Sequence, residues 1–166
     1  RFALDYSVVP VHPLDPTTVQ FWLTSDGNGP MGFDLFLESP TGWAAGFVNL
    51  GSEPGASSGS TGLMNQGAAR AVNITVVPPS VKTVAGAERT VTVIAISQTD
   101  PAVSTSLEIP MQVLAVRDVG ISLESSLPAL RPDASVGLYL SLENRGNVDL
   151  ELTPSFQLPS GWSISS

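Results

Sequence analysis

Apolar and polar residues alternate with a period of two along most of this chain, and this pattern limits the folds open to it. In residues 17–24 (TTVQFWLT), Val19, Phe21 and Leu23 share one side of an extended backbone, and residues 32–38 (GFDLFLE) repeat the pattern. Successive side chains of a β-strand point to opposite faces, so each such segment has one apolar face to bury. Segments longer than about ten residues show no 3.6-residue period. We therefore expect an all-β protein with little or no helix.

Clusters of glycine, proline, asparagine and aspartate separate the alternating segments. The chain has 15 Gly and 14 Pro, and residues 26–30 (DGNGP) are typical of a hairpin turn. Residues 51–62 (GSEPGASSGSTG) predict a long loop by composition. Hydrophobic residues make up 42% of the chain, enough for a core, whereas charged residues make up only 13%, below the roughly 25% that is usual. Together these features favour an antiparallel β-sandwich.

The net charge of −8 and the lack of cysteine restrict the expected partners and compartment. With Lys+Arg 7 against Asp+Glu 15, we expect no basic patch and no nucleic-acid binding. Cys 0 excludes disulfides, thiol nucleophiles and cysteine metal sites. An acidic surface suits a salty exterior. We expect a bacterial or archaeal protein that is extracellular or at the cell surface.

An internal repeat indicates two related domains. Residues 18–38 align with residues 135–155 at an offset of 135 − 18 = 117. The inward positions and the turn recur in order: Val19, Phe21 and Leu23 fall on Val136, Leu138 and Leu140, and Gly29 falls on Gly146. We expect a complete sandwich over residues 1–117 and the first strands of a second, incomplete one over residues 118–166. Because the chain begins at Arg1 rather than Met, we expect it to be a piece of a longer protein.

Two Pro-Ser/Thr-Gly-Trp tetrads mark corresponding places in the two copies. Their offset is 162 − 43 = 119, so the second copy is expected to have two extra residues before its proline. We interpret the tetrads as a structural corner formed by Pro40, Gly42 and Trp43 in one copy and by Pro159, Gly161 and Trp162 in the other. Proline restricts the chain direction, glycine permits a tight turn, and tryptophan covers the apolar space between sheets. The alternative is a pair of ligand-stacking sites.

The second segment has only 166 − 117 = 49 residues, which is too few for a self-sufficient core. Either the rest of that domain is absent from this chain or another chain completes it. The second case predicts a homo-oligomer formed through the incomplete domain.

Several motifs resemble a known family of modules. Residues 143–162 (ENRGNVDLELTPSFQLPSGW) combine N-x-G-N, a strand and L-P-x-G-W, and residues 97–106 (SQTDPAVSTS) match a final hairpin. This set resembles prokaryotic extracellular Ig-like repeats, namely CARDB-like (cell adhesion related) modules and the Ig-like domains attached to secreted glycosidases. Residues 85–88 (AGAE) depart from the P-G-E turn of those modules. The resemblance implies an antiparallel Ig-like sandwich of about seven strands in a tandem array outside the cell, and it implies no reaction.

Residues that catalyse reactions are poorly represented. His12 is the only histidine and stands between prolines in a surface segment, and no serine occupies a G-x-S-x-G motif. Asp34 and Glu38 lie four positions apart on one outward strand face, which is typical of a solvated edge rather than of a glycosidase cleft. We expect no enzymatic activity and no cofactor.

Oxygen-rich turns leave room for a structural Ca²⁺. Asp26, Asn28 and Asp34 surround the first turn, and the second copy has Glu143, Asn144, Asn147 and Asp149 near its own. Such oxygens bind calcium. The alternative is that Asn and Asp only stabilise the turns through their own backbone.

Outward aromatic residues are candidates for a binding surface. Trp22 and Phe36 are expected to face the same side of neighbouring strands, and Tyr139 takes the place of Trp22 in the repeat. Aromatic pairs on an outer sheet face stack on sugar rings or form protein contacts. The alternative is packing beneath a loop or against the adjacent domain. Separately, residues 73–75 form an Asn-Ile-Thr sequon, which makes Asn73 a glycosylation candidate.

These features favour a non-catalytic Ig-like module that serves as a spacer, stalk or adhesion element. Its expected partners are neighbouring repeats of the same chain, and at the cell surface another protein or a glycan. The alternatives are an accessory carbohydrate-binding or substrate-positioning module of a secreted hydrolase, or a self-assembling surface-layer subunit.

Overall fold

The computed structural model describes the whole chain except residues 14, 51–52, 80–82, 124–133 and 165–166. All regular structure in the described residues is β. The strands are β1 (Phe2–Ala3), β2 (Val9–Val11), β3 (Thr17–Thr24), β4 (Met31–Glu38), β5 (Ala44–Phe47), β6 (Ser58–Met64), β7 (Ala69–Val77), β8 (Glu88–Ser97), β9 (Ser104–Val113), β10 (Val119–Leu123) and β11 (Leu140–Asn144). The predicted all-β class is confirmed.

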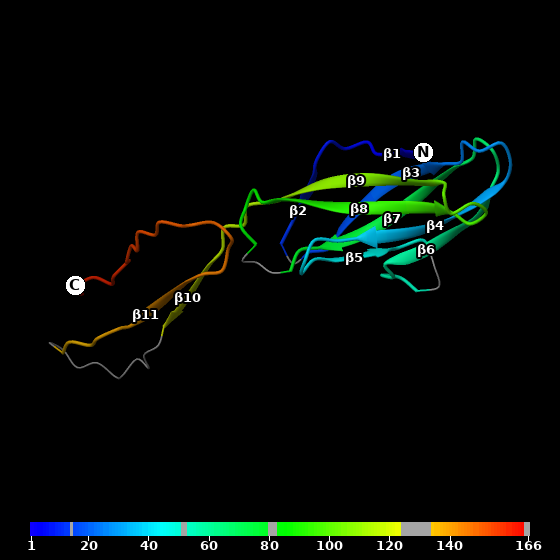
Figure 1. Cartoon of the computed structure of the whole chain (residues 1–166). Coiled ribbons are helices and arrows are strands. Elements are labelled where there is room, and N and C mark those ends of the chain that lie inside the picture. Colours follow the sequence, from blue (N-terminus) through cyan, green and yellow to red (C-terminus); the bar gives the residue numbers. More distant parts are fainter. Residues whose placement is uncertain (14, 51–52, 80–82, 124–133, 165–166) are drawn as a thin grey trace.

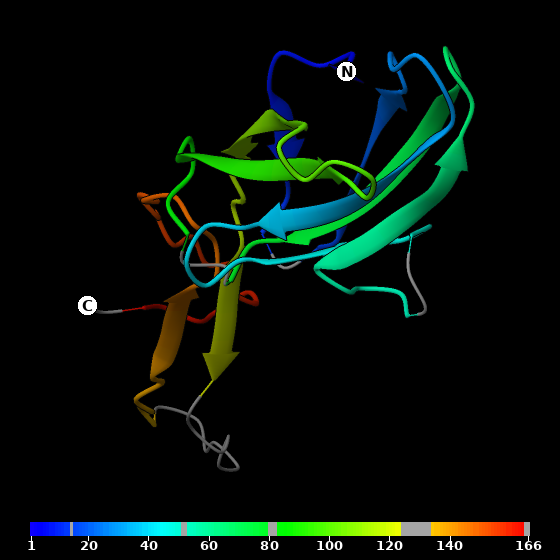
Figure 2. The same cartoon turned by 45° about the vertical axis from the view of Figure 1, so that its right-hand side comes forward.

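Strands β1 to β9 form two facing sheets (Figures 1 and 2). The first sheet has the order β1-β3-β7-β5 and the second the order β2-β9-β8-β4-β6. These orders contain the A-B-E-D and G-F-C arrangements of the immunoglobulin sandwich. The described part of this sandwich has nine strands rather than about seven, because the first strand divides between the sheets as β1 and β2, and β6 extends one edge. All neighbouring strands are antiparallel except β2 and β9, which are parallel.

The core lies between the two sheets and follows the predicted alternation. Val19, Phe21 and Leu23 of β3 are at most 2% exposed, and the ring of Phe2 packs edge-on against Phe21 at 5.6 Å between centroids. β7 contributes a further buried row, and β8 and β9 cover it from the second sheet: Val72, Ile74, Val76, Val91, Val93, Ala95, Ile109, Met111 and Val113. Each fully buried valine, leucine, isoleucine, phenylalanine or methionine side chain stabilises the fold by about 1.5–3 kcal/mol. Among the described residues, the buried hydrophobic core extends from Val9 to Val113.

The connection over residues 25–30 differs from the expected hairpin. β3 pairs with β1 and β7, whereas β4 pairs with β6 and β8, so the connection crosses from one sheet to the other. A connection that joins strands of two different sheets is an arch. Because β3 and β4 lie in opposite sheets, their apolar faces meet in the core, whereas a hairpin would place both strands in one sheet. Ser25 enters the arch fully buried, and its backbone bonds to the 67–68 turn.

Part of the predicted long loop is a strand. β6 occupies residues 58–64 and pairs with β4, with a register shift between Gly32 and Asp34. Its sequence, SGSTGLM, lacks the apolar alternation that predicts a strand. Met64 of β6 joins the core, and ladder bonds to β4 along the edge of the second sheet hold the rest of this strand in its conformation.

After the sandwich, β10 and β11 form an antiparallel ladder of their own. In it Ile121 lies opposite Leu142, just as Phe2 lies opposite Leu23 in the ladder of β1 and β3. The differences are 121 − 2 = 119 and 142 − 23 = 119, the same as the offset between the tetrads. One offset of 119 for both strands is consistent with these ladders and with the tetrads, and the backbone bends at residues 27–29 and 146–148 lie 119 positions apart as well.

Candidate functional site: the junction after the sandwich

Asn147 joins the end of the sandwich to the segment that follows it. Its Nδ2 donates to the carbonyl oxygens of Thr83 at 3.0 Å and Leu114 at 2.9 Å. Its Oδ1 accepts from the amide of Val116 at 2.7 Å. In the backbone, its amide donates to the Val116 carbonyl at 3.1 Å and its carbonyl accepts from Ala85 at 3.5 Å. One side chain thus satisfies three backbone groups from two parts of the sandwich end.

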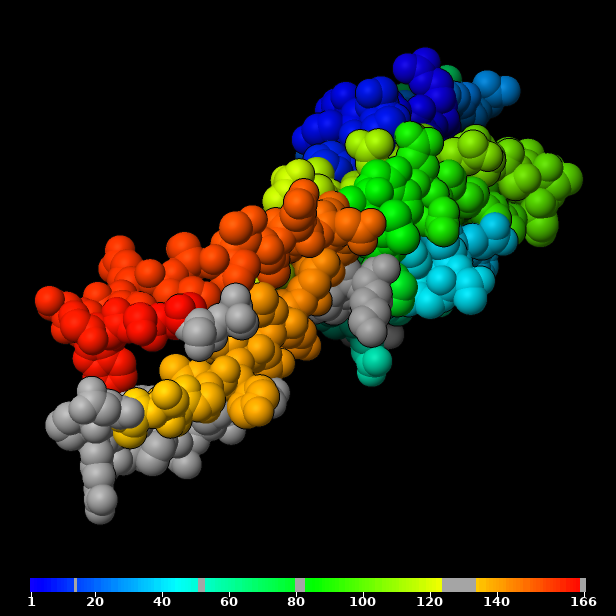
Figure 3. Space-filling view, turned by 90° about the vertical axis from the view of Figure 1, so that its left-hand side faces the viewer, coloured from blue at the N-terminus to red at the C-terminus, as the bar shows by residue number. Residues whose placement is uncertain are grey.

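The turn around Asn147 lies directly against the chain that leaves β9. A Cβ atom at Gly146 would stand 2.2 Å from the carbonyl oxygen of Val116, so only glycine permits this approach. The amide of Arg145 donates to the Asp118 carbonyl at 2.9 Å. Figure 3 shows the orange atoms of this part of the chain in contact with green atoms at the end of the sandwich. We call residues 144–147, together with the backbone at residues 83–85 and 114–118, the junction.

A surface ion pair borders the junction. Arg145 Nε lies 2.9 Å from Glu143 Oε2, and this hydrogen bond, with the charge of Glu143, raises the pKa of Arg145 above its usual value. Exposed ion pairs contribute little to stability, so the junction depends on the bonds of Asn147.

Two of the three proposed calcium ligands at the first turn, Asp26 and Asp34, contact other groups. Asp34 accepts a hydrogen bond from Gln98 Nε2 at 2.7 Å, and Asp26 Oδ2 lies 3.8 Å from the amino group of Arg1. In the second turn, Asn144 Oδ1 accepts from the amide of Gly146 at 3.0 Å. Within the described residues no three His, Asp or Glu side chains gather to hold a metal. The second turn has the geometry of the alternative, in which Asn side chains bond the local backbone.

The aromatic candidates do not form one surface. Trp22 and Phe36 are 41% and 42% exposed, but Trp22 lies on β3 in the first sheet and Phe36 on β4 in the second. The expectation that they face the same side of neighbouring strands is therefore wrong, because residues 25–30 cross between the sheets. Tyr139 precedes β11 in the following segment and is 72% exposed.

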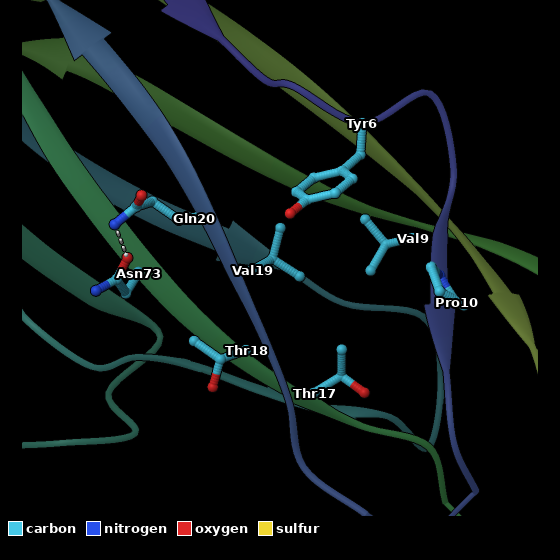
Figure 4. A pocket seen from close by; sticks show the side chains of 8 residues that line it. All are labelled: Tyr6, Val9, Pro10, Thr17, Thr18, Val19, Gln20 and Asn73. Atoms are coloured by element: carbon cyan, nitrogen blue, oxygen red, sulfur yellow. Dashed lines mark hydrogen bonds between the residues drawn. The ribbon is translucent and has the colours of Figure 1, made fainter.

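The sequon residue Asn73 borders a shallow depression of about 450 Å³ beside β3 (Figure 4). Its Oδ1 accepts a hydrogen bond from Gln20 Nε2 at 3.1 Å. Tyr6, Val9 and Pro10 form the opposite wall, where the chain passes from β1 to β2. Apolar side chains, the hydroxyls of Tyr6, Thr17 and Thr18, and two amides form this lining. Glycosylation of Asn73 stays a prediction.

The two tetrads adopt the same turn in different surroundings. The amide of Trp43 donates to the Pro40 carbonyl at 3.0 Å, and the amide of Trp162 donates to the Pro159 carbonyl at 3.2 Å. The third turn residues, Gly42 and Gly161, have φ of 81° and 84°, as a type II turn requires. Trp43 is only 7% exposed, whereas Trp162 is 54% exposed.

His12 lies just after β2 at the surface, with its Nδ1 2.9 Å from both Asp15 Oδ2 and the Pro13 carbonyl. The described residues contain no helix long and apolar enough to cross a membrane. In the junction the side chain of Asn147 bonds three backbone groups, whereas sequence reasoning identified this residue only as an oxygen ligand. The recurrence of Gly-Asn at residues 27–28 and 146–147, 119 positions apart, was the available signal.

No protein-family model and no curated protein matches the chain. Among solved structures, the secreted serine protease VesC from Vibrio cholerae is similar with 14% identity and a TM-score of 0.41, over 67% of this chain and 22% of that one. The PapD-like domain 7 of human CEP192 has 13% identity and a TM-score of 0.40, over 70% and 84%. The E. coli chaperone DraB has 14% identity and a TM-score of 0.38, over 69% and 55%. The Ig-like fold assigned to this chain rests on its own strand order.

Proposed function

We propose that this chain is a non-catalytic Ig-like module that acts as a spacer or adhesion element in a tandem array outside the cell. The observation that supports it best is the parallel pairing of β2 with β9, the second and the last strands of the sandwich. Val9 lies opposite Met111 and Val11 opposite Val113, and the amide of Leu114 donates to the Val11 carbonyl at 2.9 Å. A strand near the entry of the domain is thereby fastened to the strand at its exit.

This arrangement suits a module that bears tension between its neighbours. When the two ends of a parallel pair are pulled apart, all the hydrogen bonds of the ladder are loaded together in shear. β1 makes only two ladder pairs with β3, so the load passes to β2 and β9. The core contacts of Val9, Val11, Met111 and Val113 resist the same displacement.

The junction supports the same function. A spacer extends reach only if successive modules hold a defined direction, and flexible linkers do not provide this. The bonds of Asn147 to Leu114 and Val116 replace a flexible linker by a hydrogen-bonded one.

Single-molecule force measurements on the full chain test this proposal. We expect Leu114→Pro, which removes the amide that bonds Val11 but keeps an exposed position, to lower the unfolding force. The matched control is Val103→Pro at another exposed position, which removes the single bond from its amide to Asp100 in a turn remote from β2. Equal unfolding forces for the two variants, at equal stability in denaturant, would refute the load-bearing role.

The accessory carbohydrate-binding alternative predicts a different result. A glycan-array signal from the full chain that disappears in Trp22→Ala would favour it over the spacer. The separation of Trp22 from Phe36 removes the aromatic pair on which this alternative depended. If another chain completes the second segment, the molecular mass of the protein in solution should rise with its concentration. Trp162→Ala should then reduce this rise.

A further inference from the structure

We infer that the turn over residues 26–29 forms a second junction, in which it binds the end of another copy of this sandwich. That end consists of the backbone at residues 83–85 and 114–118 of the other copy. This inference rests on the proposed tandem function and names the surface and partner involved. The order of domains would be head to tail, with the partner placed before Arg1.

The offset of 119 places the two turns in correspondence. Gly27 and Asn28 match Gly146 and Asn147, and the backbone bends at residues 27–29 and again at residues 146–148. Arg1 and Thr24 exchange two backbone bonds of 2.8 Å, and Gly120 pairs with Glu143 at the corresponding place. Both turns therefore follow a strand that is paired in the same register with the strand that enters its domain.

The two asparagines differ in what they contact. Asn147 bonds three backbone groups of the sandwich, whereas Asn28 is exposed, and no hydrogen bond of its side chain occurs among the described residues. The two glycines differ in the same way. A Cβ at Gly146 meets the Val116 backbone at 2.2 Å, whereas a Cβ at Gly27 has the flexible end of the Met31 side chain as its nearest neighbour at 3.1 Å and no backbone atom nearer than 3.9 Å. The first turn therefore has the glycine and the asparagine of the junction, but among the described residues no sandwich end contacts them.

The second junction would form at the opposite end of the sandwich from the first. In Figure 1, residues 25–30 lie at the right-hand end of the sandwich and the segment after β9 leaves from the left. A partner for Asn28 must offer two carbonyl oxygens and one amide in the spacing of Thr83, Leu114 and Val116. A second copy of this sandwich offers this set, because these groups are fixed there by β9 and by the turn before β8.

A tandem protein tests the inference. Joining residues 1–119 directly before Arg1 of the full chain keeps the 119-residue period, and residues 9–113 hold a complete core in each copy. The measurement is hydrogen exchange of the Asn28 side-chain amide by NMR, with Asn147 as the protected reference. We expect the Asn28 signals to divide into two classes: a fast one from the first copy, as in the single chain, and one slowed about tenfold or more from the second copy.

Variants at Gly27 test whether the turn over residues 26–29 contacts the preceding copy of the sandwich. Gly27→Ala should leave the single chain unchanged, because Met31 can move, but in the second copy of the tandem it should abolish the protection of Asn28. Gly29→Ala is the control, since a Cβ there has nothing within 4 Å. One fast class of Asn28 signals in a folded tandem, or a second copy that fails to fold beside an intact first copy, would overturn the inference. The force experiment does not involve Asn28, so either proposal can fail without the other.

Discussion

Asn147 Nδ2 donates a hydrogen bond to the carbonyl oxygen of Thr83 across 3.0 Å, although 64 positions separate the two residues in the chain. This bond links the turn after β11 to the loop before β8, and so to the end of the sandwich. A segment with few buried side chains of its own is held there by hydrogen bonds to the backbone at the end of the sandwich.

Replacing the donor should open the junction without unfolding the sandwich. Asn147→Asp has the same shape but places a carboxylate against the carbonyls of Thr83 and Leu114. Two hydrogen bonds of about 0.5–1.5 kcal/mol each are lost, so exchange of the Val116 amide should accelerate roughly 5- to 150-fold. Asp149→Asn is the control, because it also changes one charge, at an exposed position outside the junction. Unchanged exchange at Val116 in Asn147→Asp would contradict the assignment.

The two tetrad tryptophans should differ sharply in their contribution to stability. Trp43 is 7% exposed in the core, so Trp43→Ala should lower the free energy of unfolding by about 3–5 kcal/mol. Trp162 is 54% exposed, and Trp162→Ala should change it by less than about 1 kcal/mol. Urea denaturation of both variants provides the comparison. Similar losses would mean that Trp162 is buried in solution by something the described residues do not supply.

Removing the hydroxyl of Ser25 should make the protein more stable. It is fully buried, and its Oγ has no hydrogen-bond partner among the described residues. Because an unsatisfied buried group costs about 1–3 kcal/mol, Ser25→Ala should raise the melting temperature by a few degrees. Ser97→Ala serves as the matched case: Ser97 is equally buried, but its Oγ accepts from the amides of Thr99 and Asp100, so its loss should destabilise. A destabilised Ser25→Ala would show that the hydroxyl has a partner.

Gly146→Ala should displace the turn from the sandwich, since the new Cβ would overlap the Val116 carbonyl. Loss of exchange protection at the Asn147 side-chain amide reports this displacement. At Gly137 a Cβ meets nothing within 4 Å, so Gly137→Ala should keep the protection. If both variants retain it, the close approach of residues 146 and 116 is not a constraint.

Part of the candidate site was accessible from the sequence. Asn147 stood out as one of several oxygen-bearing residues near a turn, and that chemistry suggested calcium as readily as a hydrogen-bonded junction. Applying the tetrad offset of 119 to the whole chain would have aligned Gly27-Asn28 with Gly146-Asn147. It would not have revealed Thr83 as a partner, because nothing in the local sequence of residues 83–85 reports where that loop lies.

By itself, the sequence determined the β class of this protein and the inward face of its apolar strands. Val19, Phe21 and Leu23 are buried as predicted, because the alternation of side chains is a local property of an extended backbone. Only the tertiary structure decided which strands are neighbours. It turned residues 25–30 into an arch, which placed Trp22 and Phe36 in different sheets, and it made a strand of β6 and brought Asn147 to Thr83. Strand partners and junctions depend on how distant segments share one core and satisfy each other's backbone groups, and a local pattern does not encode that choice.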